Sequence, residues 1–148
     1  MWNKVQSSAK FYSELEKEVF ELVKHFKGQK VPGHLFNAEG EFTLPTFTDV
    51  LPNHRIASEG MLCEVDILGE GQGFRWVIEI KGVLRDGQSG IAQVRALSHA
   101  LKAQPWLIVF TDLSASTRAA AHAHGVLITG ANEWKELKKL ILAESHNA

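Results

Sequence analysis

Residues 61–81 read MLCEVDILGEGQGFRWVIEIK, and this stretch decides the fold that we expect for the chain. Apolar residues recur at every second position over 61–68 and again over 74–81, which is the side-chain period of a β-strand. The glycine-rich segment 69–73 between them is typical of a turn. The stretch therefore predicts an antiparallel hairpin.

Charged residues occupy this hairpin in an unusual setting. Glu79 and Lys81 share one face of the second strand, although the run 77–81 is otherwise apolar. A carboxylate among apolar residues is costly unless it is paired or binds a metal ion. Glu64 and Asp66 share a face of the first strand, so the pairing of the hairpin brings acids from both strands to one end of the sheet.

Converging carboxylates are the hard oxygen ligands that Mg²⁺ prefers, and a neighbouring ammonium group stabilises charge that develops on a phosphate. We therefore expect a Mg²⁺ or Mn²⁺ site at this end of the sheet. The alternative is a solvated face of an edge hairpin, held by a salt bridge between the strands.

Helices and strands alternate after the hairpin, which predicts an α/β fold with a central mixed sheet flanked by helices. Before the hairpin, an apolar stripe at helical spacing predicts a first helix. The expected elements are a helix over 8–26, the hairpin, a helix over 88–103, a strand over 106–110, a helix after Ser114, a strand over 126–129 and a last helix.

The segment 28–60 stands apart because it holds three of the four prolines and several glycines. We expect an irregular insertion of unknown role there, with one short hairpin around 42–47. The remainder of 1–148 is expected to form a single domain around one sheet.

Composition excludes several classes of protein. Sixteen basic and 17 acidic residues give a formal net charge of −1, so the chain does not hold nucleic acid by bulk charge. No apolar run approaches the roughly 20 residues of a membrane span. A lone cysteine, Cys63, fits a reducing setting, and we expect a cytoplasmic protein.

The sequence resembles the PD-(D/E)XK nuclease superfamily, with Asp66 followed by Glu79-Ile80-Lys81 as its signature. Mrr-type restriction enzymes and archaeal Holliday junction resolvases are the nearest members. The resemblance implies a restriction endonuclease-like fold in the order α-βββ-α-β-α-β-α. It also implies that Asp66, Glu79 and the carbonyl of Ile80 hold the metal ion, while Lys81 positions the attacking water.

The resemblance further implies a glutamate from the first helix at the metal site. Glu16 borders the apolar stripe of that helix and is the expected residue, whereas Glu18 borders the opposite edge and is the alternative. Gln93 in the second helix would bind the water or a phosphate. Glu64 is either a fourth acid at the site or an exposed side chain.

These residues imply a metal-dependent deoxyribonuclease. An endonuclease is expected rather than an exonuclease. DNA is the expected partner, and a homodimer or a larger protein would supply target recognition. One alternative is a catalytically inactive nuclease-fold module that binds DNA or a protein. Another is an unrelated α/β binding domain, which would be favoured if Asp66 and Glu79 lay far apart.

Overall fold

The computed structural model describes residues 14–58, 61–82 and 87–147. The first helix is described from residue 14 to residue 23. The elements that follow are β1 (Lys30–Pro32), the 3₁₀ helix η1 (Gly33–Phe36), β2 (Glu41–Thr43), β3 (Asp49–Ser58), β4 (Met61–Gly71), β5 (Phe74–Lys81), α2 (Gly87–Leu101), β6 (Gln104–Val109), α3 (Ala115–Ala123), β7 (Leu127–Thr129) and α4 (Ala131–Asn147).

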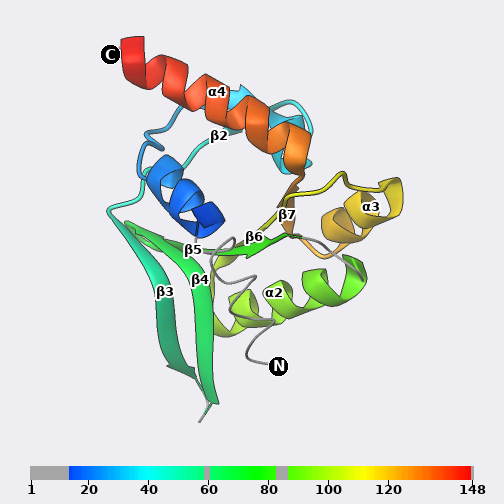
Figure 1. The fold of residues 1–148 in the computed structure, drawn as a ribbon. Coiled ribbons are helices and arrows are strands. Elements are labelled where there is room, and N and C mark those ends of the chain that lie inside the picture. Colours follow the sequence, from blue (N-terminus) through cyan, green and yellow to red (C-terminus); the bar gives the residue numbers. More distant parts are fainter. Residues whose placement is uncertain (1–13, 59–60, 83–86, 148) are drawn as a thin grey trace.

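A five-stranded mixed sheet organises these elements, in the order β3-β4-β5-β6-β7. The first three strands are antiparallel neighbours, whereas β5, β6 and β7 run parallel and are joined by helices. The β3–β4 ribbon continues past the end of β5 and projects from the sheet (Figure 1). The expected α/β class, with a central mixed sheet flanked by helices, is confirmed.

Helices cover both faces of the sheet (Figure 1). The first helix, η1 and α4 pack on one face, around the buried Trp106 and Trp134. On the other face, α2 and α3 cover a second apolar cluster that includes Val65, Leu68 and Val77. Burial of these side chains is the main stabilising contribution to the fold. Among the helices that the structure describes, none combines the length and apolar composition that a membrane crossing needs.

The expectation of an irregular segment over 28–60 is wrong. Residues 49–58 form β3, a ten-residue edge strand that pairs with β4. β1 and β2 pair with each other across η1, so the short hairpin expected around 42–47 is also absent from the described structure. Pro52 is tolerated because an edge strand has one side without a ladder partner.

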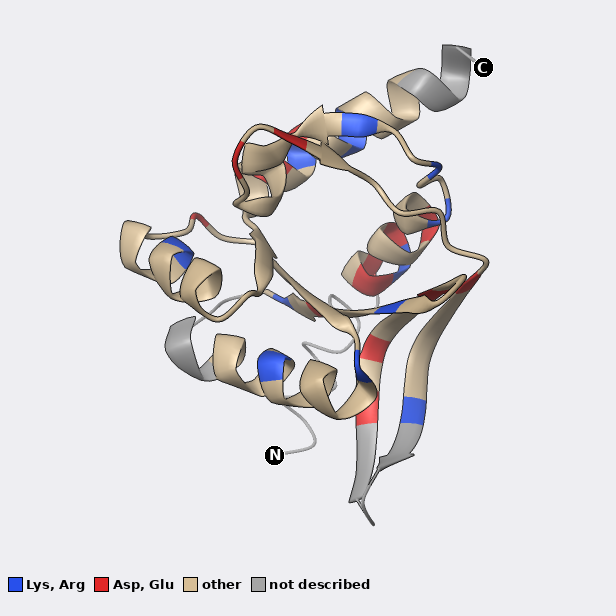
Figure 2. Ribbon diagram, turned by 180° about the vertical axis from the view of Figure 1, so that it is seen from behind, with Lys and Arg blue, Asp and Glu red and all other residues tan. Residues whose placement is uncertain are grey.

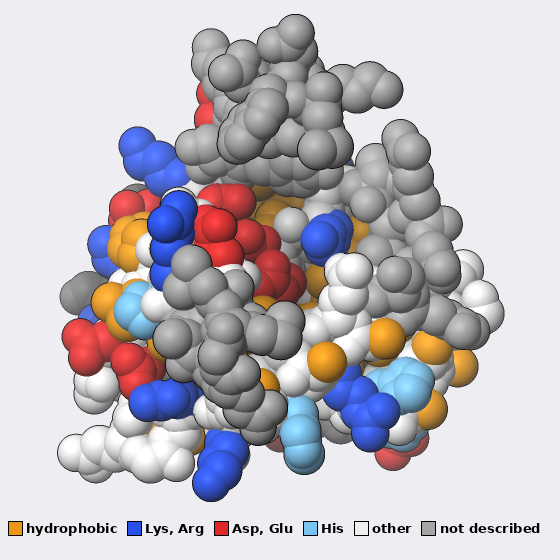
Figure 3. All heavy atoms as spheres, turned by 90° about the horizontal axis from the view of Figure 1, so that it is seen from below, with side chains coloured by type: hydrophobic (Ala, Val, Ile, Leu, Met, Phe, Trp, Pro, Cys, Tyr) orange, Lys and Arg blue, Asp and Glu red, His pale blue; other side chains and the backbone are white. Residues whose placement is uncertain are grey.

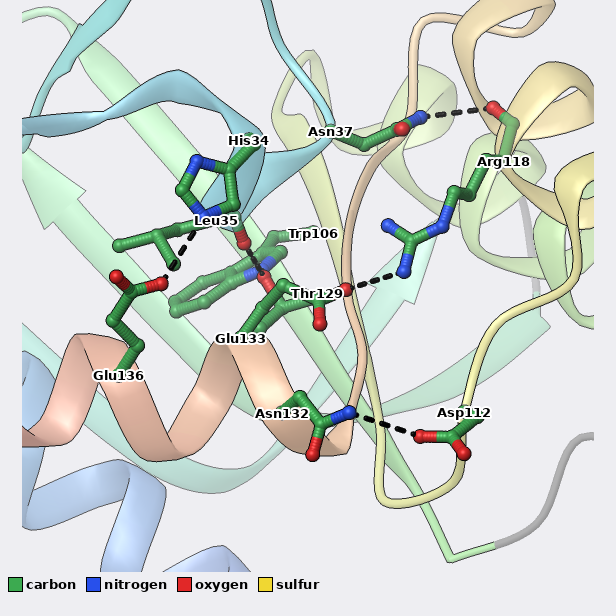
Figure 4. A network of polar contacts seen from close by, with 10 residues as sticks. All are labelled: His34, Leu35, Asn37, Trp106, Asp112, Arg118, Thr129, Asn132, Glu133 and Glu136. Atoms are coloured by element: carbon green, nitrogen blue, oxygen red, sulfur yellow. Dashed lines mark hydrogen bonds and ion pairs between the residues drawn. The ribbon is translucent and has the colours of Figure 1, made fainter.

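The segment before β3 belongs to the core. Leu35 and Phe36 of η1 are fully buried against the sheet. The Trp106 Nε1 donates to Thr129 Oγ1 at 2.8 Å, and Thr129 Oγ1 donates to the Leu35 carbonyl at 2.7 Å (Figure 4). Asn37, just after η1, donates to the Arg118 carbonyl of α3 at 2.8 Å. These bonds attach η1 to β6, β7 and α3.

Candidate functional site

Asp66 and Glu79 face each other where β4 and β5 separate. The β4–β5 ladder ends at Ile67 and Ile78, so the next positions on the two strands are Asp66 and Glu79. In place of a ladder, each carboxyl accepts from the backbone of the other strand. The Asp66 N–H donates to Glu79 Oε1 at 3.4 Å, and the Ile80 N–H donates to Asp66 Oδ2 at 2.9 Å. The expected meeting of these two acids is confirmed.

Glu79 is held in an environment that disfavours its charge. Burial raises the pKa of Glu79 from 4.5 to about 9, and the charge of Asp66 and a hydrogen bond between the two carboxyl groups add to this rise. The Asp66 N–H and the charge of Lys81 act in the opposite direction and lower the pKa of Glu79. Without a bound cation, this environment therefore favours the protonated form of Glu79.

Lys81 and Gln93 lie in one pocket beside this pair. The pocket has a volume of about 230 Å³ and opens between β4, β5 and α2. Glu64, Glu79, Lys81 and Gln93 supply its polar wall, while Gly90, Val94 and Leu97 of α2 supply the apolar wall. Four residues singled out from the sequence are thus brought together, although they come from three elements.

The first helix adds Glu16 to the group. The pKa of Glu16 is raised to about 7 by burial first, and then by the charges of Asp66 and Glu64. Glu18 has a different role, because its Oε1 accepts from Trp134 Nε1 at 3.2 Å and from Lys138 Nζ at 2.6 Å. Glu16 is therefore close enough to Asp66 and Glu64 for their charges to act on it, and Glu18 anchors the helix to α4.

The distribution of charge agrees with these contacts. Acidic positions of the first helix lie near those of β4 in the ribbon view (Figure 2). On the face seen in Figure 3, Asp and Glu side chains gather in one place, with Lys or Arg side chains on either side. The site is itself locally acidic, because Glu16, Glu64, Asp66 and Glu79 lie near one another, although the whole chain is close to neutral.

The side chains fit a divalent cation in their chemistry. Asp66, Glu79 and Glu16 offer carboxylate oxygens, the donors that Mg²⁺ and Mn²⁺ prefer. A bound cation would offset the charge repulsion that raises the pKa of Glu79. In the part of the chain that the structure describes, no group of three His, Cys, Asp or Glu side chains is already arranged as a complete metal site. Binding would therefore require the carboxylates to turn toward the ion.

Two features of the site carry no recognisable signal in the sequence. β3 lies beside β4 at Asp66, although that segment was expected to be irregular. Asn53 of β3 has a φ of +47°, within the left-handed region. The Pro52-Asn53 pair is a turn-like signal, and the sequence carries no indication that it falls inside a strand next to Asp66.

No protein-family model matches the chain, and a search of curated proteins found no match. Solved structures with a similar fold were found. Protein VC1899 from Vibrio cholerae is 25% identical over 66% of this chain and 28% of its own, with a TM-score of 0.56. Can2 from Sulfobacillus thermosulfidooxidans, in complex with cyclic tetra-adenylate, is 11% identical over 64% of this chain and 29% of its own, with a TM-score of 0.53.

A third structure, of a protein of unknown function named AF1548, is 22% identical over 55% of this chain and 48% of its own, with a TM-score of 0.49. In all three cases the matched region spans less than half of the other protein. The likeness to VC1899 and Can2 concerns the arrangement of sheet and helices.

Proposed function

We propose that this chain is a divalent-metal-dependent nuclease of the PD-(D/E)XK type that hydrolyses phosphodiester bonds in DNA. One observation carries the proposal: Asp66 and Glu79 meet where two strands separate, and Glu79 is buried there at a cost in free energy. A purely structural site gains little from a buried pair of acids, whereas a cation site requires them. The likeness to Can2, a protein solved with cyclic tetra-adenylate, is compatible with a nucleotide ligand.

Each side chain has a separate role in this proposal. Asp66, Glu79 and Glu16 bind the cation with their carboxylate oxygens, and Ile80 adds its backbone carbonyl. Lys81 positions the attacking water and stabilises the negative charge that develops on the phosphate oxygens. Gln93 binds the water or a phosphate from the α2 side of the pocket. A bound cation would supply a lowered pKa at the attacking water and neutralisation of phosphate charge.

The test is a cleavage assay on linear, supercoiled and branched DNA, with an RNA substrate alongside, in Mg²⁺, Mn²⁺ or EDTA. We expect cleavage of DNA with either metal ion and none in EDTA. Asp66→Ala is expected to lose activity in Mg²⁺ and to regain part of it at high Mn²⁺. Cleavage in EDTA, or an Asp66→Ala variant as active as the parent in Mg²⁺, would contradict the proposal.

The alternative is a nuclease-fold module without catalysis, and the near-zero net charge favours it mildly because it gives no general attraction to DNA. Calorimetry with Mg²⁺ and Mn²⁺ separates the two proposals. Metal binding that is lost in Asp66→Ala supports the nuclease. DNA or protein binding that is unchanged by metal ions and by Asp66→Ala supports the inactive module.

A further inference from the structure

Asn53 has a backbone conformation that is unusual for its place in the fold. Its φ of +47° lies in the left-handed region, in the middle of the strand β3. The other described non-glycine residues with positive φ are Asn37, at the end of η1, and Lys102, just after α2. Left-handed residues are ordinary at helix ends, whereas inside a strand they carry strain that is often linked to function.

The pairing of β3 with β4 is interrupted at this residue. Pro52 pairs with Ile67 and His54 pairs with Val65, but Asn53 and Asp66, the positions between them, are not partners. On its other side, the β4–β5 ladder has already ended at Ile67. Asp66 therefore lies at a break in regular pairing on both sides of β4.

The apolar side chains of β4 also depart from regular alternation around this position. Val65 and Leu68 pack in the same apolar cluster on the α2 side, although residues three apart in a regular strand point to opposite faces. Ile67 packs in the cluster on the other side. Asp66 lies where the alternation fails, which lets its carboxylate meet Glu79 and also act on Glu16 of the first helix.

We propose that Asn53 is a positioning residue, whose left-handed backbone interrupts the β3–β4 pairing at Asp66 and so places this carboxylate between β5 and the first helix. The proposal rests on the proposed function for its catalytic consequence, but the placement of Asp66 can be measured separately. Asn, Asp and Gly adopt left-handed φ most readily, and β-branched residues resist it. Substitution at position 53 therefore acts on Asp66 through the backbone.

The experiment compares Asn53→Gly, Asn53→Asp and Asn53→Val. We expect the Gly and Asp variants to keep Mg²⁺ affinity and cleavage rate within about threefold of the parent, and Asn53→Val to lose at least tenfold in both. Asn53→Ala replaces Asn53→Val if the latter does not fold. Lys102→Val is the matched control, since it places the same strain at the exposed end of α2 and should leave Mg²⁺ affinity unchanged.

A second readout does not depend on catalysis. The Ile80 N–H donates to Asp66 Oδ2, so its hydrogen exchange reports the position of that carboxylate. We expect Asn53→Val to speed exchange of the Ile80 amide at least tenfold, with Asn53→Gly close to the parent. Equal protection in the parent and in Asn53→Val, or equal damage in Asn53→Gly and Asn53→Val, would overturn the inference. A parent that neither binds metal nor cleaves DNA would instead contradict the proposed function.

Discussion

Lys81 is the basic group that shares the pocket with Glu64 and Glu79, and it is expected to act mainly in the transition state. Lys81→Ala should lower the cleavage rate by about a hundredfold or more, as loss of a comparable electrostatic group does. Metal and DNA affinity should change little, because the remaining ligands and phosphate contacts stay. Initial rates and calorimetry measure the two effects, with the exposed Lys30→Ala as the control.

Mn²⁺ is not expected to rescue the Lys81→Ala variant, because the defect of this variant is not in metal binding. Cleavage at the parent rate by Lys81→Ala, in a preparation free of contaminating nuclease, would contradict the role assigned to this lysine.

Glu16 and Glu18 make a matched pair on one helix. Burial and the charges of Asp66 and Glu64 raise the pKa of Glu16, which lies near these acids. Glu16→Gln should therefore weaken Mg²⁺ binding by about tenfold or more. Glu18 bonds to Trp134 and Lys138, so Glu18→Gln should lower the free energy of unfolding by about 1 kcal/mol and leave Mg²⁺ affinity unchanged. Calorimetry and thermal unfolding give both quantities, and the reverse pattern would reassign the metal ligand to Glu18.

Glu79 should make the stability of the metal-free protein depend on pH. Its pKa is raised to about 9, so between pH 4.5 and 9 the folded chain holds a proton that the unfolded chain has released. Stability contributed by the protonated group is present at low pH and is lost as pH rises through this range. Each pKa unit of the difference corresponds to about 1.4 kcal/mol.

Glu79→Gln removes this titration, so we expect it to stabilise the protein in EDTA, and more at pH 8 than at pH 5. The measurement is chemical unfolding at both pH values, with exposed Glu41→Gln as the control. A Glu79→Gln variant that is less stable than the parent at pH 8 would show that burial of the Glu79 carboxyl group does not lower the free energy of unfolding.

At the scale of elements, the attachment of η1 to the sheet depends on one buried hydroxyl. Thr129 Oγ1 accepts from Trp106 and donates to the Leu35 carbonyl, and all three side chains are fully buried. Thr129→Val keeps the shape but leaves both polar partners unsatisfied, so it should cost about 1–3 kcal/mol of unfolding free energy. Thr129→Ser keeps the hydroxyl and should lose less. Equal losses in the two variants would argue against the hydrogen bonds.

The hairpin of β4 and β5 could be predicted because its apolar residues follow a period of two and its turn carries glycines. β3 could not be predicted in this way. Pro52, Asn53 and the polar residues after them break the apolar and polar alternation that indicates a strand, and an edge strand tolerates such residues. In the same way, the strand positions of Asp66 and Glu79 predicted that the two acids meet. The approach of Glu16 depends on how the first helix packs, and this can be read only from the fold.

The turn between β4 and β5 is shorter than the glycines of the sequence predict. Gly69 and Gly71 were expected in the turn, but β4 continues to Gly71 and the turn is limited to Gln72 and Gly73. A Cβ at Gly69 would lie 2.6 Å from the Phe47 ring. The close packing of the Phe47 ring therefore requires a glycine at position 69. In the sequence alone, this glycine looks like part of the turn.

At the scale of the whole molecule, the described residues 14–58, 61–82 and 87–147 hold one cluster of the Asp66, Glu79 and Lys81 type, so one chain is expected to cut one DNA strand at a time. Cleavage of both strands then requires two chains or two successive events. With supercoiled plasmid as substrate, we expect the nicked circle to appear first. The linear form should follow with a rate that rises faster than linearly with protein concentration if two chains act together.

Gel analysis of the time course, paired with sedimentation of the protein free and on DNA, measures this dependence. Asp66→Ala mixed in excess with the parent provides the internal control, because a mixed dimer would nick but not linearise. If the linear form arises without a nicked intermediate at concentrations where sedimentation shows a monomer, a single chain must reach both strands. The prediction of one cut per site would then be wrong.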